Sequence, residues 1–482
     1  MVRALTVDVG SSSIRTALVS ETGAVEHVHR ERVHVTSPRP GDVELDAAEI
    51  AELMLALATR TIDAGGSGDV VAITNQRATT VVFDVTTGRA VGPALSWQDL
   101  RTVIDCLVLQ GDGVRLAPNQ SATKIKWLVD QTDVARRNLR FATLETWVAW
   151  QLSRGSAFVT DRSNAGVTGL VDVGLRQWNT LILDALDIDP TMLGTLVDTM
   201  GTIGVASALP GSPPIAAMVG DQPASLFGQS CVRTGGKITF GTGAILDVVS
   251  DDGAPAQLQL LPAGCYPTVL RSRDGVVTWG VEGIVLSAGS CVEWLCDLGV
   301  LDSPSSSSEV ATSVNASDGV WFVPAFAGLG TPRWDFGARG AFFGLTRGTT
   351  RAHLCRAVLE GVAHRGVDLL DAARLDTHRA LDDVRIDGGM SASPYFVQRL
   401  ADFSGRPVAV SSEREATTRG AGLMALVGAG HLSLDDVEGL WSPSYVAVPS
   451  ISEDERLDAR TQWTSVVARV EGTIPELSSI SF

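Results

Sequence analysis

The chain has 482 residues, 45% of them hydrophobic and 19% charged, and this length exceeds one ordinary hydrophobic core, so we expect two domains. The formal net charge of −17 argues against nucleic acid and anionic membranes as partners, and no uninterrupted apolar stretch approaches the length of a membrane span. The six cysteines are scattered without a CxxC pair, which is typical of reduced thiols in the cytoplasm, the compartment that we expect.

The first half of the chain predicts strands first and then a mixture of strands and helices. Residues 3–35 read as an antiparallel set: LTVDVG, IRTALVS and, after a turn, the alternating run AVEHVHRERVHV. An amphipathic helix is expected over 46–64, strands over 70–74 and 80–84, and helices over 123–131 and 144–152. A proline-rich turn at 210–214 precedes a short buried strand over 215–220, which ends in Gly220–Asp221–Gln222.

The opening pattern begins again in the middle of the chain. Residues 237–249 predict a strand, a Gly-Thr-Gly turn and a second strand, as residues 3–20 do. This weak repeat places a boundary near 228–236 and divides the chain into domains 1–230 and 231–482. Pro304–Ser308 is low in complexity and predicts an exposed loop. Helices are expected over 351–373, 393–403 and 453–471, so the fold class is α/β.

Three strand-like runs end in turns of small residues: LTVDVGSSSIR (Leu5–Arg15), ITFGTG (Ile238–Gly243) and IDGGMSAS (Ile386–Ser393). Such turns direct several backbone N–H groups at one spot, which suits a phosphate oxygen. The first turn also carries Asp8 and Arg15, residue types that hold Mg²⁺ through its waters and neutralise phosphate charge. Together they predict one nucleotide held between the two halves of the chain.

Other familiar sites are missing from the sequence, which has no GxxxxGK[ST], GxGxxG, GxSxG or HExxH motif. Asp221 follows a buried strand, and a carboxylate there could accept the proton of an alcohol during phosphoryl transfer. On the residues alone, capping of a turn is an equally good interpretation of Asp221. Arg77 and Trp97 also follow strands and suit a polyhydroxyl compound, although a tryptophan in such a place more often belongs to the core.

At these residues the chain resembles the FGGY family of carbohydrate kinases, and within it the glycerol kinase subgroup, almost from end to end. The long stretch Gly340–Glu360 fits the second signature of the family throughout, and such a long pattern is specific. The matching segments are ITNQRATT (Ile73–Thr80), LSWQDLRT (Leu95–Thr102), GDQPASLFGQ (Gly220–Gln229), FVPAFAGLGTPRWD (Phe322–Asp335), GAFFGLTRGTTRAHLCRAVLEG (Gly340–Gly361) and IDGG (Ile386–Gly389).

The resemblance implies two actin-like (ribonuclease H-like) domains around a cleft that binds ATP and Mg²⁺. Carried over by position, Asp8 would bind Mg²⁺ through water, Asp221 would be the general base, and Gln222, Arg77 and Trp97 would touch the sugar or polyol. The positions that would contact the nucleotide are Ser11, Ser12, Ser13, Arg15, Gly241, Thr242, Gly289, Glu293, Gly388, Gly389 and Ser393.

The departures from the family pattern cluster in the substrate pocket. Ala78 stands where glycerol kinases have a glutamate, Asn119 where they have a tyrosine, and Ile245 where they have an aromatic residue. A site that lacks a hydrogen-bonding group often discriminates by about 10⁴–10⁵ against the ligand that needs it. We therefore expect a roomier pocket and a polyol or ketose of roughly four to six carbons. On the nucleotide side, Glu293 replaces a usual glutamine and Ser393 a usual asparagine.

The leading hypothesis is an ATP-dependent kinase of a small polyol or sugar, with an altered substrate pocket. The alternative in the same class is glycerol kinase proper, with neighbouring residues restoring the lost contacts. A non-catalytic nucleotide sensor on the same fold is less favoured, because Asp8, Arg15, Asp221 and Thr242 are all retained and a sensor needs no base. Family members are often dimers or tetramers, which leaves a homodimer and a homotetramer both open.

Overall fold

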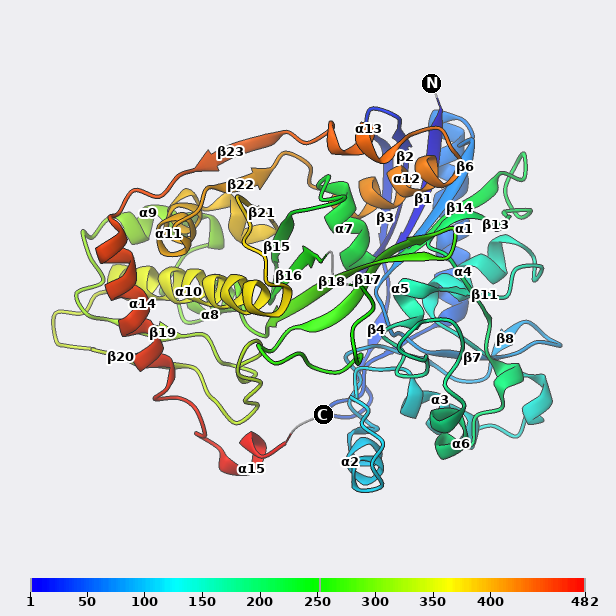
Figure 1. The fold of residues 1–482 in the computed structure, drawn as a ribbon, viewed down its shortest axis with the longest axis horizontal. Coiled ribbons are helices and arrows are strands. Elements are labelled where there is room, and N and C mark those ends of the chain that lie inside the picture. The colour runs from blue at the N-terminus through cyan, green and yellow to red at the C-terminus, as the bar shows by residue number, and fades with distance from the viewer. Residues whose placement is uncertain (1, 251–252, 481–482) are drawn as a thin grey trace.

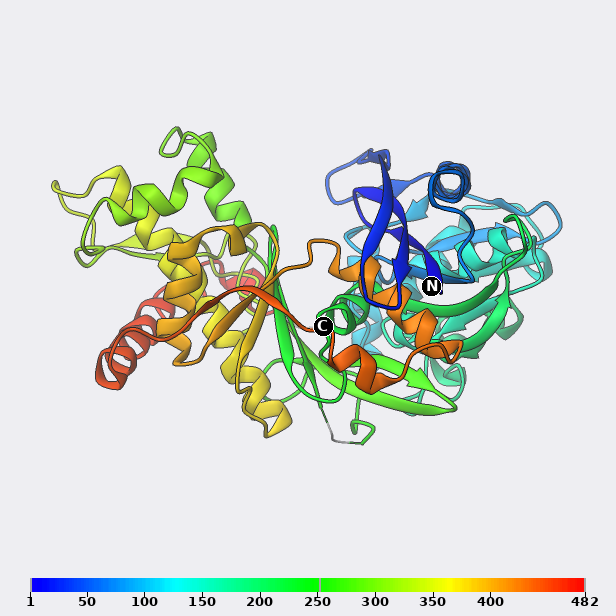
Figure 2. The ribbon, with the colours of Figure 1, turned by 90° about the horizontal axis from the view of Figure 1, so that it is seen from above.

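The structure, a computed structural model, describes residues 2–250 and 253–480. The chain forms two lobes that lie side by side, with the blue and cyan N-terminal elements in one and the yellow and red helices in the other (Figures 1 and 2). Each lobe is built on one mixed β-sheet, as the predicted α/β class requires. Among the described residues no helix is both long and apolar enough to cross a membrane.

The first sheet has the order β13-β14-β6-β1-β2-β3. Its central strand β1 pairs antiparallel with β2 and parallel with β6, and from Ala4 onward its residues are buried because helices cover both faces. One face carries α1 and α4. The side chain of Asp46 caps α1 by accepting a hydrogen bond from Ala48 N (2.8 Å). The elements are β1 (Arg3–Val9), β2 (Ser13–Ser20), β3 (Val25–Arg32), β6 (Val70–Asn75), β13 (Met200–Val205), β14 (Pro214–Gly220), α1 (Ala47–Gly65) and α4 (Leu144–Leu152).

The second sheet, of order β17-β18-β16-β15-β21-β22-β23, repeats this arrangement. Its first strand β15 pairs antiparallel with β16 and parallel with β21, as β1 pairs with β2 and β6. Helices α8, α10 and α11 cover one face. The elements are β15 (Gly236–Phe240), β16 (Ala244–Val249), β17 (Tyr266–Arg273), β18 (Val276–Val285), β21 (Val384–Asp387), β22 (Val408–Ser411), β23 (Pro443–Ala447), α8 (Gly289–Asp297), α10 (Arg351–Thr377) and α11 (Pro394–Ser404).

Two helices, α7 (Asp221–Gly228) and α12 (Ala416–Gly428), cross at very close range on the other face of the first sheet. A Cβ on Gly420 would lie 1.8 Å from Ala224 O, so only glycine permits this approach. Because α12 comes late in the chain, the C-terminal half contributes to both lobes (Figure 1). The division at residues 230 and 231 stays a prediction about the sequence.

The predicted strands and helices are confirmed in type and place, within a few residues. The loop expected over Pro304–Ser308 is wrong: Pro304–Ser306 form a 3₁₀ turn and Ser307 begins α9, where its carbonyl accepts a bond from Cys355 Sγ (3.3 Å). Proline suits the first position of a helical turn, so this composition starts a helix as readily as a loop. All six cysteines are free thiols.

The remaining elements are short. They are β4 (Val35–Thr36), β5 (Glu44–Leu45), β7 (Val81–Asp84), β8 (Arg89–Ala90), β9 (Ala94–Leu95), β10 (Leu139–Ala142), β11 (Val159–Asp161), β12 (Thr195–Val197), β19 (Trp321–Val323), β20 (Ala341–Phe343), α2 (Val103–Gly111), α3 (Ala122–Asp130), α5 (Arg162–Ala165), α6 (Thr180–Leu186), α9 (Ser307–Thr312), α13 (Leu434–Glu438), α14 (Glu453–Val467) and α15 (Pro475–Ser478).

Candidate active site

The hairpin β1–β2 places a carboxylate beside a guanidinium group where the first sheet meets α12. Asp8 and Arg15 face each other across the two strands, with Arg15 Nη1 3.3 Å from Asp8 Oδ2. Thr418 Oγ1, from α12, donates a hydrogen bond to the same oxygen (3.1 Å). Of the turn serines, Ser11 and Ser12 are exposed and Ser13 is buried. The first predicted motif is therefore assembled with a late segment of the chain against it.

Burial raises the pKa of Asp8 to about 6, although Arg15 and the Thr418 hydroxyl oppose this shift. The charges of Asp221 and Glu415 raise it further, so negative groups gather at this point. A divalent cation there would favour the ionised carboxylate, and a carboxylate oxygen is the ligand type that Mg²⁺ prefers. The residues present thus fit a magnesium ion.

Glu415 is a neighbour of this pair that sequence reasoning missed. It precedes α12, and its carboxylate lies 3.2 Å from Arg15 Nη1 and 2.5 Å from Arg30 Nη2. Arg15 therefore has two carboxylate partners, one from each half of the chain. No motif marks Glu415, because nearly the whole chain separates it from Arg15.

Arg77 and Asp221 lie close together, because they follow the neighbouring parallel strands β6 and β14. Arg77 Nε lies 3.5 Å from Asp221 Oδ1, and the Gln222 N–H donates to the same oxygen (2.9 Å). Gly220 makes this approach possible, since a Cβ there would lie 2.5 Å from Arg77 Cδ. Burial raises the pKa of Asp221 above its usual value, against the effect of Arg77 and of the Gln222 N–H.

The ends of β6 and β14 are also held by a buried carboxyl cluster. Asn75 Nδ2 donates to Glu145 Oε2 (3.2 Å), and Gly220 N donates to Ser163 Oγ (2.9 Å), which in turn donates to Asp161 (2.6 Å). Burial raises the pKa of both Glu145 and Asp161, and the charge of Asp161 adds to the shift of Glu145. This cluster fixes the backbone that carries Arg77 and Asp221.

Arg77 also reaches across to the second sheet. Its Nη2 donates to the carboxylate of Glu282 on β18, and its Nη1 donates to Thr268 Oγ1 on β17 (3.3 Å). Although burial opposes the charge, Glu282 and Asp221 raise the pKa of Arg77, so it stays protonated. Sequence reasoning missed Glu282, but a signal existed: it is the one acid in the otherwise uncharged strand VVTWGVEGIV.

A second buried pair, Lys237 and Asp247, lies next to Glu282 on the same face of the second sheet. Lys237, Asp247 and Glu282 are consecutive cross-strand partners on β15, β16 and β18. Both side chains of the pair are 0% exposed, and Lys237 Nζ is 3.0 Å from Asp247 Oδ2. Lys237 Nζ also donates to Gln222 Oε1 (2.6 Å). The pair therefore fixes the side chain that follows Asp221 in sequence.

The three glycine segments of the second lobe lie against one another. Gly289 N donates to Gly241 O (2.8 Å), and the Thr242 carbonyl accepts from Ala288 N (2.8 Å) at the start of α8. A Cβ on Gly388 would lie 2.4 Å from Phe240 O, whereas Gly389 has open space beside it. The exposed backbone of these turns forms a surface of the kind that cradles a nucleotide.

The other predicted positions are less closely joined. Ala78 is buried at φ 61°, and its carbonyl accepts a bond from Ser121 Oγ (3.2 Å). Trp97 is 39% exposed and Asn119 is exposed, and within the described part of the chain no hydrogen bond or ion pair links either to Arg77 or Asp221. The remaining three lie on the second lobe: Ile245 half-buried on β16, Glu293 exposed on α8, and Ser393 capping α11.

Comparison with known proteins shows the family to which the chain belongs. Models of the FGGY family of carbohydrate kinases match its two halves, the N-terminal domain at residues 3–228 and the C-terminal domain at residues 236–429. The chain belongs to this family. It is therefore an ATP-dependent kinase of carbohydrates or polyols.

The relatives of this FGGY kinase include glycerol kinases from Dechloromonas aromatica, 37% identical, and Deinococcus radiodurans, 35% identical. In both cases the alignment covers 96% of this chain and 97% of the relative. A glycerol kinase of Plasmodium falciparum, solved with ADP, superposes with a TM-score of 0.90 at 26% identity over 100% of this chain and 99% of that one. A xylulose kinase of Rhodospirillum rubrum shares the fold (TM-score 0.84, 21% identity, 97% and 98% covered).

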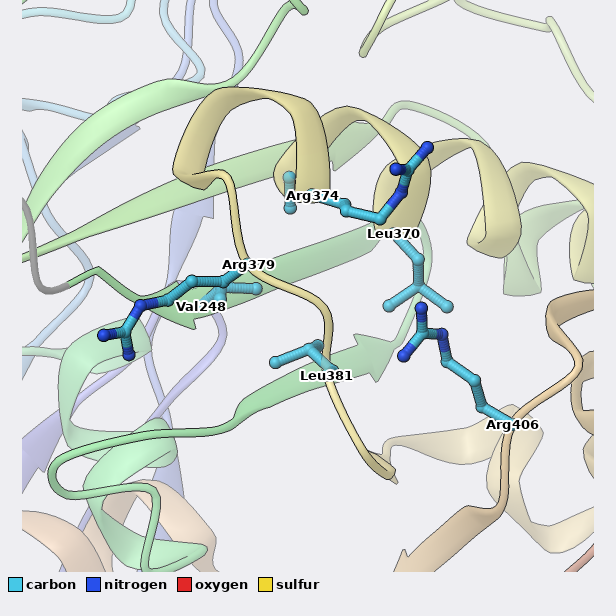
Figure 3. A pocket seen from close by; sticks show the side chains of 7 residues that line it. Val248, Leu370, Arg374, Arg379, Leu381 and Arg406 are labelled. Atoms are coloured by element: carbon cyan, nitrogen blue, oxygen red, sulfur yellow. The ribbon is translucent and has the colours of Figure 1, made fainter.

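Two hollows of the FGGY kinase differ in volume and in which parts of the chain line them. A cavity of about 110 Å³ is lined by both halves of the chain, including Gln120 from the first and Tyr266 from the second. The other hollow, of about 10 Å³, has room for about one water and lies on the α10 face of the second sheet. Its guanidinium groups point in different directions (Figure 3). It is lined by Val248, Leu370, Ala373, Arg374, Arg379, Leu381 and Arg406.

Proposed function

We propose that this kinase transfers the γ-phosphoryl group of Mg-ATP to a hydroxyl of a small polyol or sugar longer than glycerol, with Asp221 as the general base. The observation that carries the proposal is the environment of Asp221. Its carboxylate stands at the end of β14, partly exposed, with Arg77 at 3.5 Å and a raised pKa. A base with a pKa moved toward neutrality is better matched to accepting the proton of an alcohol.

On the nucleotide side, the backbone of Gly241 and Thr242 would hold the β- and γ-phosphates, and Gly388 and Gly389 would flank the adenosine. Asp8 would hold Mg²⁺ through water. When bound, the ion neutralises charge on the phosphates. Arg15 has two carboxylate partners, at 3.2 and 3.3 Å. It would exchange one of them for a phosphoryl oxygen and keep the other, so the exchange would cost little free energy.

On the acceptor side, Asp221 would take the proton of the reacting hydroxyl while Arg77 and Gln222 hold the substrate in line. Lys237 fixes the amide of Gln222 through its oxygen, which leaves the Nε2 group to donate to the substrate. Closure of the lobes would exclude water, so that the phosphoryl group passes to the alcohol and not to water.

The size of the substrate is argued from Ala78, Asn119 and Ile245, each smaller or less aromatic than the residue of the glycerol kinase pattern. Glycerol kinase proper is the second candidate, and the names of the relatives at 35% and 37% identity favour it. A cytoplasmic location and a homodimeric or homotetrameric state stay predictions of the sequence.

The experiment that tests this function is a coupled ADP-release assay with polyols and ketoses of three to seven carbons. Turnover with a four- to six-carbon compound well above that with glycerol would support the proposal. Efficient turnover with glycerol alone would establish the second candidate. ADP binding without turnover of any compound would overturn both.

A further inference from the structure

We propose that the substrate site has a distal half, formed by Glu282, Tyr266 and the adjoining cavity, which binds the end of a polyhydroxyl substrate remote from the reacting hydroxyl. We call this part the distal subsite. The inference rests on the proposed function, because Asp221 must mark the reacting end. It goes beyond that function by stating where a longer substrate lies and which side chains select it.

The first observation is that Arg77 joins two carboxylates. Its Nε faces Asp221 at 3.5 Å, and its Nη2 donates to Glu282, which comes from the other sheet. Two acceptors on different nitrogens of one planar guanidinium can bind two hydroxyls of a single polyol. By accepting a hydrogen bond from a substrate hydroxyl, the Glu282 carboxylate would supply from the second lobe the acceptor that the chain lacks at Ala78.

The second observation is that a cavity lies beside Tyr266, a neighbour of Glu282 on the second sheet. Tyr266 is its cross-strand partner on β17, and burial together with the charge of Glu282 raises the pKa of the Tyr266 phenol to about 12. Tyr266 also lines the cavity of about 110 Å³. The opposite wall comes from the first lobe and includes Ala117 and Gln120. The cavity therefore lies beside Tyr266, the cross-strand neighbour of Glu282.

The volume and lining of the cavity define the ligand. A water needs about 10–15 Å³ by the same measure, so the cavity has room for several such groups and hence for about two or three hydroxylated carbons. The amides of Gln120, Asn179 and Gln259 alternate there with apolar side chains of Leu116 and Val171. Arg115 also lines the cavity, and its guanidinium can donate to hydroxyl oxygens, so the wall offers both donors and acceptors. The expected substrate is thus a polyhydroxyl compound, a polyol or ketose.

Three variants test the distal subsite by the ratio of kcat/KM for a five-carbon polyol or ketose to kcat/KM for glycerol. Ala117→Leu fills part of the cavity and should lower the ratio about 10–200-fold. Glu282→Gln and Tyr266→Phe should lower the ratio about 10-fold or more. Matched controls are Glu438→Gln, whose carboxylate also pairs with a distant arginine (Arg233 Nη1, 2.7 Å), and Tyr445→Phe on the exposed strand β23. Neither control should change the ratio.

The outcomes separate this inference from the function on which it rests. Equal losses for glycerol and for the longer compound in all folded variants would overturn the distal subsite and leave the kinase reaction in place. A wild-type preference for glycerol over every longer compound would do the same. Absence of wild-type turnover with every compound would overturn the proposed function and the distal subsite together. If Ala117→Leu fails to fold in a thermal unfolding assay, the other two variants decide.

Discussion

The two lobes begin with the same hairpin but use it differently. In β1–β2 the carboxylate of Asp8 faces Arg15 at 3.3 Å, and in β15–β16 the ammonium group of Lys237 faces Asp247 at 3.0 Å. Arg15 keeps 24% of its side chain exposed and has a second carboxylate partner, whereas Lys237 and Asp247 are both fully buried. An open pair can exchange a partner for a ligand, while a buried pair can only hold its surroundings in place.

Asp221 interacts electrostatically with a member of each pair. Burial raises the pKa of Asp221, Arg77 and the Gln222 N–H lower it, and within the buried pair Lys237 lowers it while Asp247 raises it. The charge of Asp221 in turn raises the pKa of Asp8. Under the proposed function, the first hairpin would serve the phosphate side, whereas the second orients Gln222, the residue after Asp221. This division can be tested by substitution of Asp221, of the buried pair and of the open pair.

The largest effect is expected from Asp221→Asn, which keeps the shape of the side chain and removes its ability to accept a proton. Turnover should fall by about 10²–10⁴, because general base catalysis typically contributes that much. ADP affinity, measured by calorimetry, should change little, because the turns that would hold the nucleotide belong to other elements. Retention of full turnover by a folded variant would show that Asp221 is not the base.

The buried pair is expected to matter next, through stability. Lys237→Met leaves Asp247 charged and unpaired in the interior, and loss of one partner of such a pair costs about 3–5 kcal/mol in the free energy of unfolding. Chemical denaturation measures this change. The double variant Lys237→Met, Asp247→Leu should recover much of the loss, because both charges are then gone.

The open pair supplies the contrast. Arg15→Met should cost less unfolding free energy than Lys237→Met, because Arg15 is 24% exposed, Thr418 still donates to Asp8 and Glu415 keeps Arg30 as a partner, while it strongly reduces turnover. Equal destabilisation by Arg15→Met and Lys237→Met would contradict the distinction between an open and a buried hairpin pair.

The sequence predicts the local parts of this molecule well. Strand β1, helix α4 and the three glycine turns follow from apolar runs, periodicity and small residues, which are properties of neighbouring positions. Pro304–Ser308 shows the limit of composition, since the same residues start α9. Of the proposed site, Asp8 with Arg15 and Arg77 with Asp221 come together as the adjacent strands require.

The contacts that cross the chain could not be predicted in this way. Glu282 meets Arg77 from 205 positions away, and Glu415 meets Arg15 from 400 positions away. Such pairs depend on how the lobes dock and on the crossing of α7 and α12, which no local pattern encodes. The sequence signal for such contacts is a single carboxylate in an otherwise apolar strand, as at Asp247 and Glu282.

The smallest expected effect is a pH dependence at the open pair. Because the pKa of Asp8 is raised to about 6, protons compete with Mg²⁺ for its carboxylate at a higher pH than for an ordinary aspartate. The Mg²⁺ concentration for half-maximal turnover should be constant above about pH 7 and rise toward tenfold per unit of pH below about 6. Protonation of Asp221 would be separable, since loss of the proposed base would lower turnover even at saturating Mg²⁺. In Asp8→Asn the residual activity should lose this part of the pH dependence, so an identical profile in both proteins would show that the proton is taken up elsewhere, for instance by ATP.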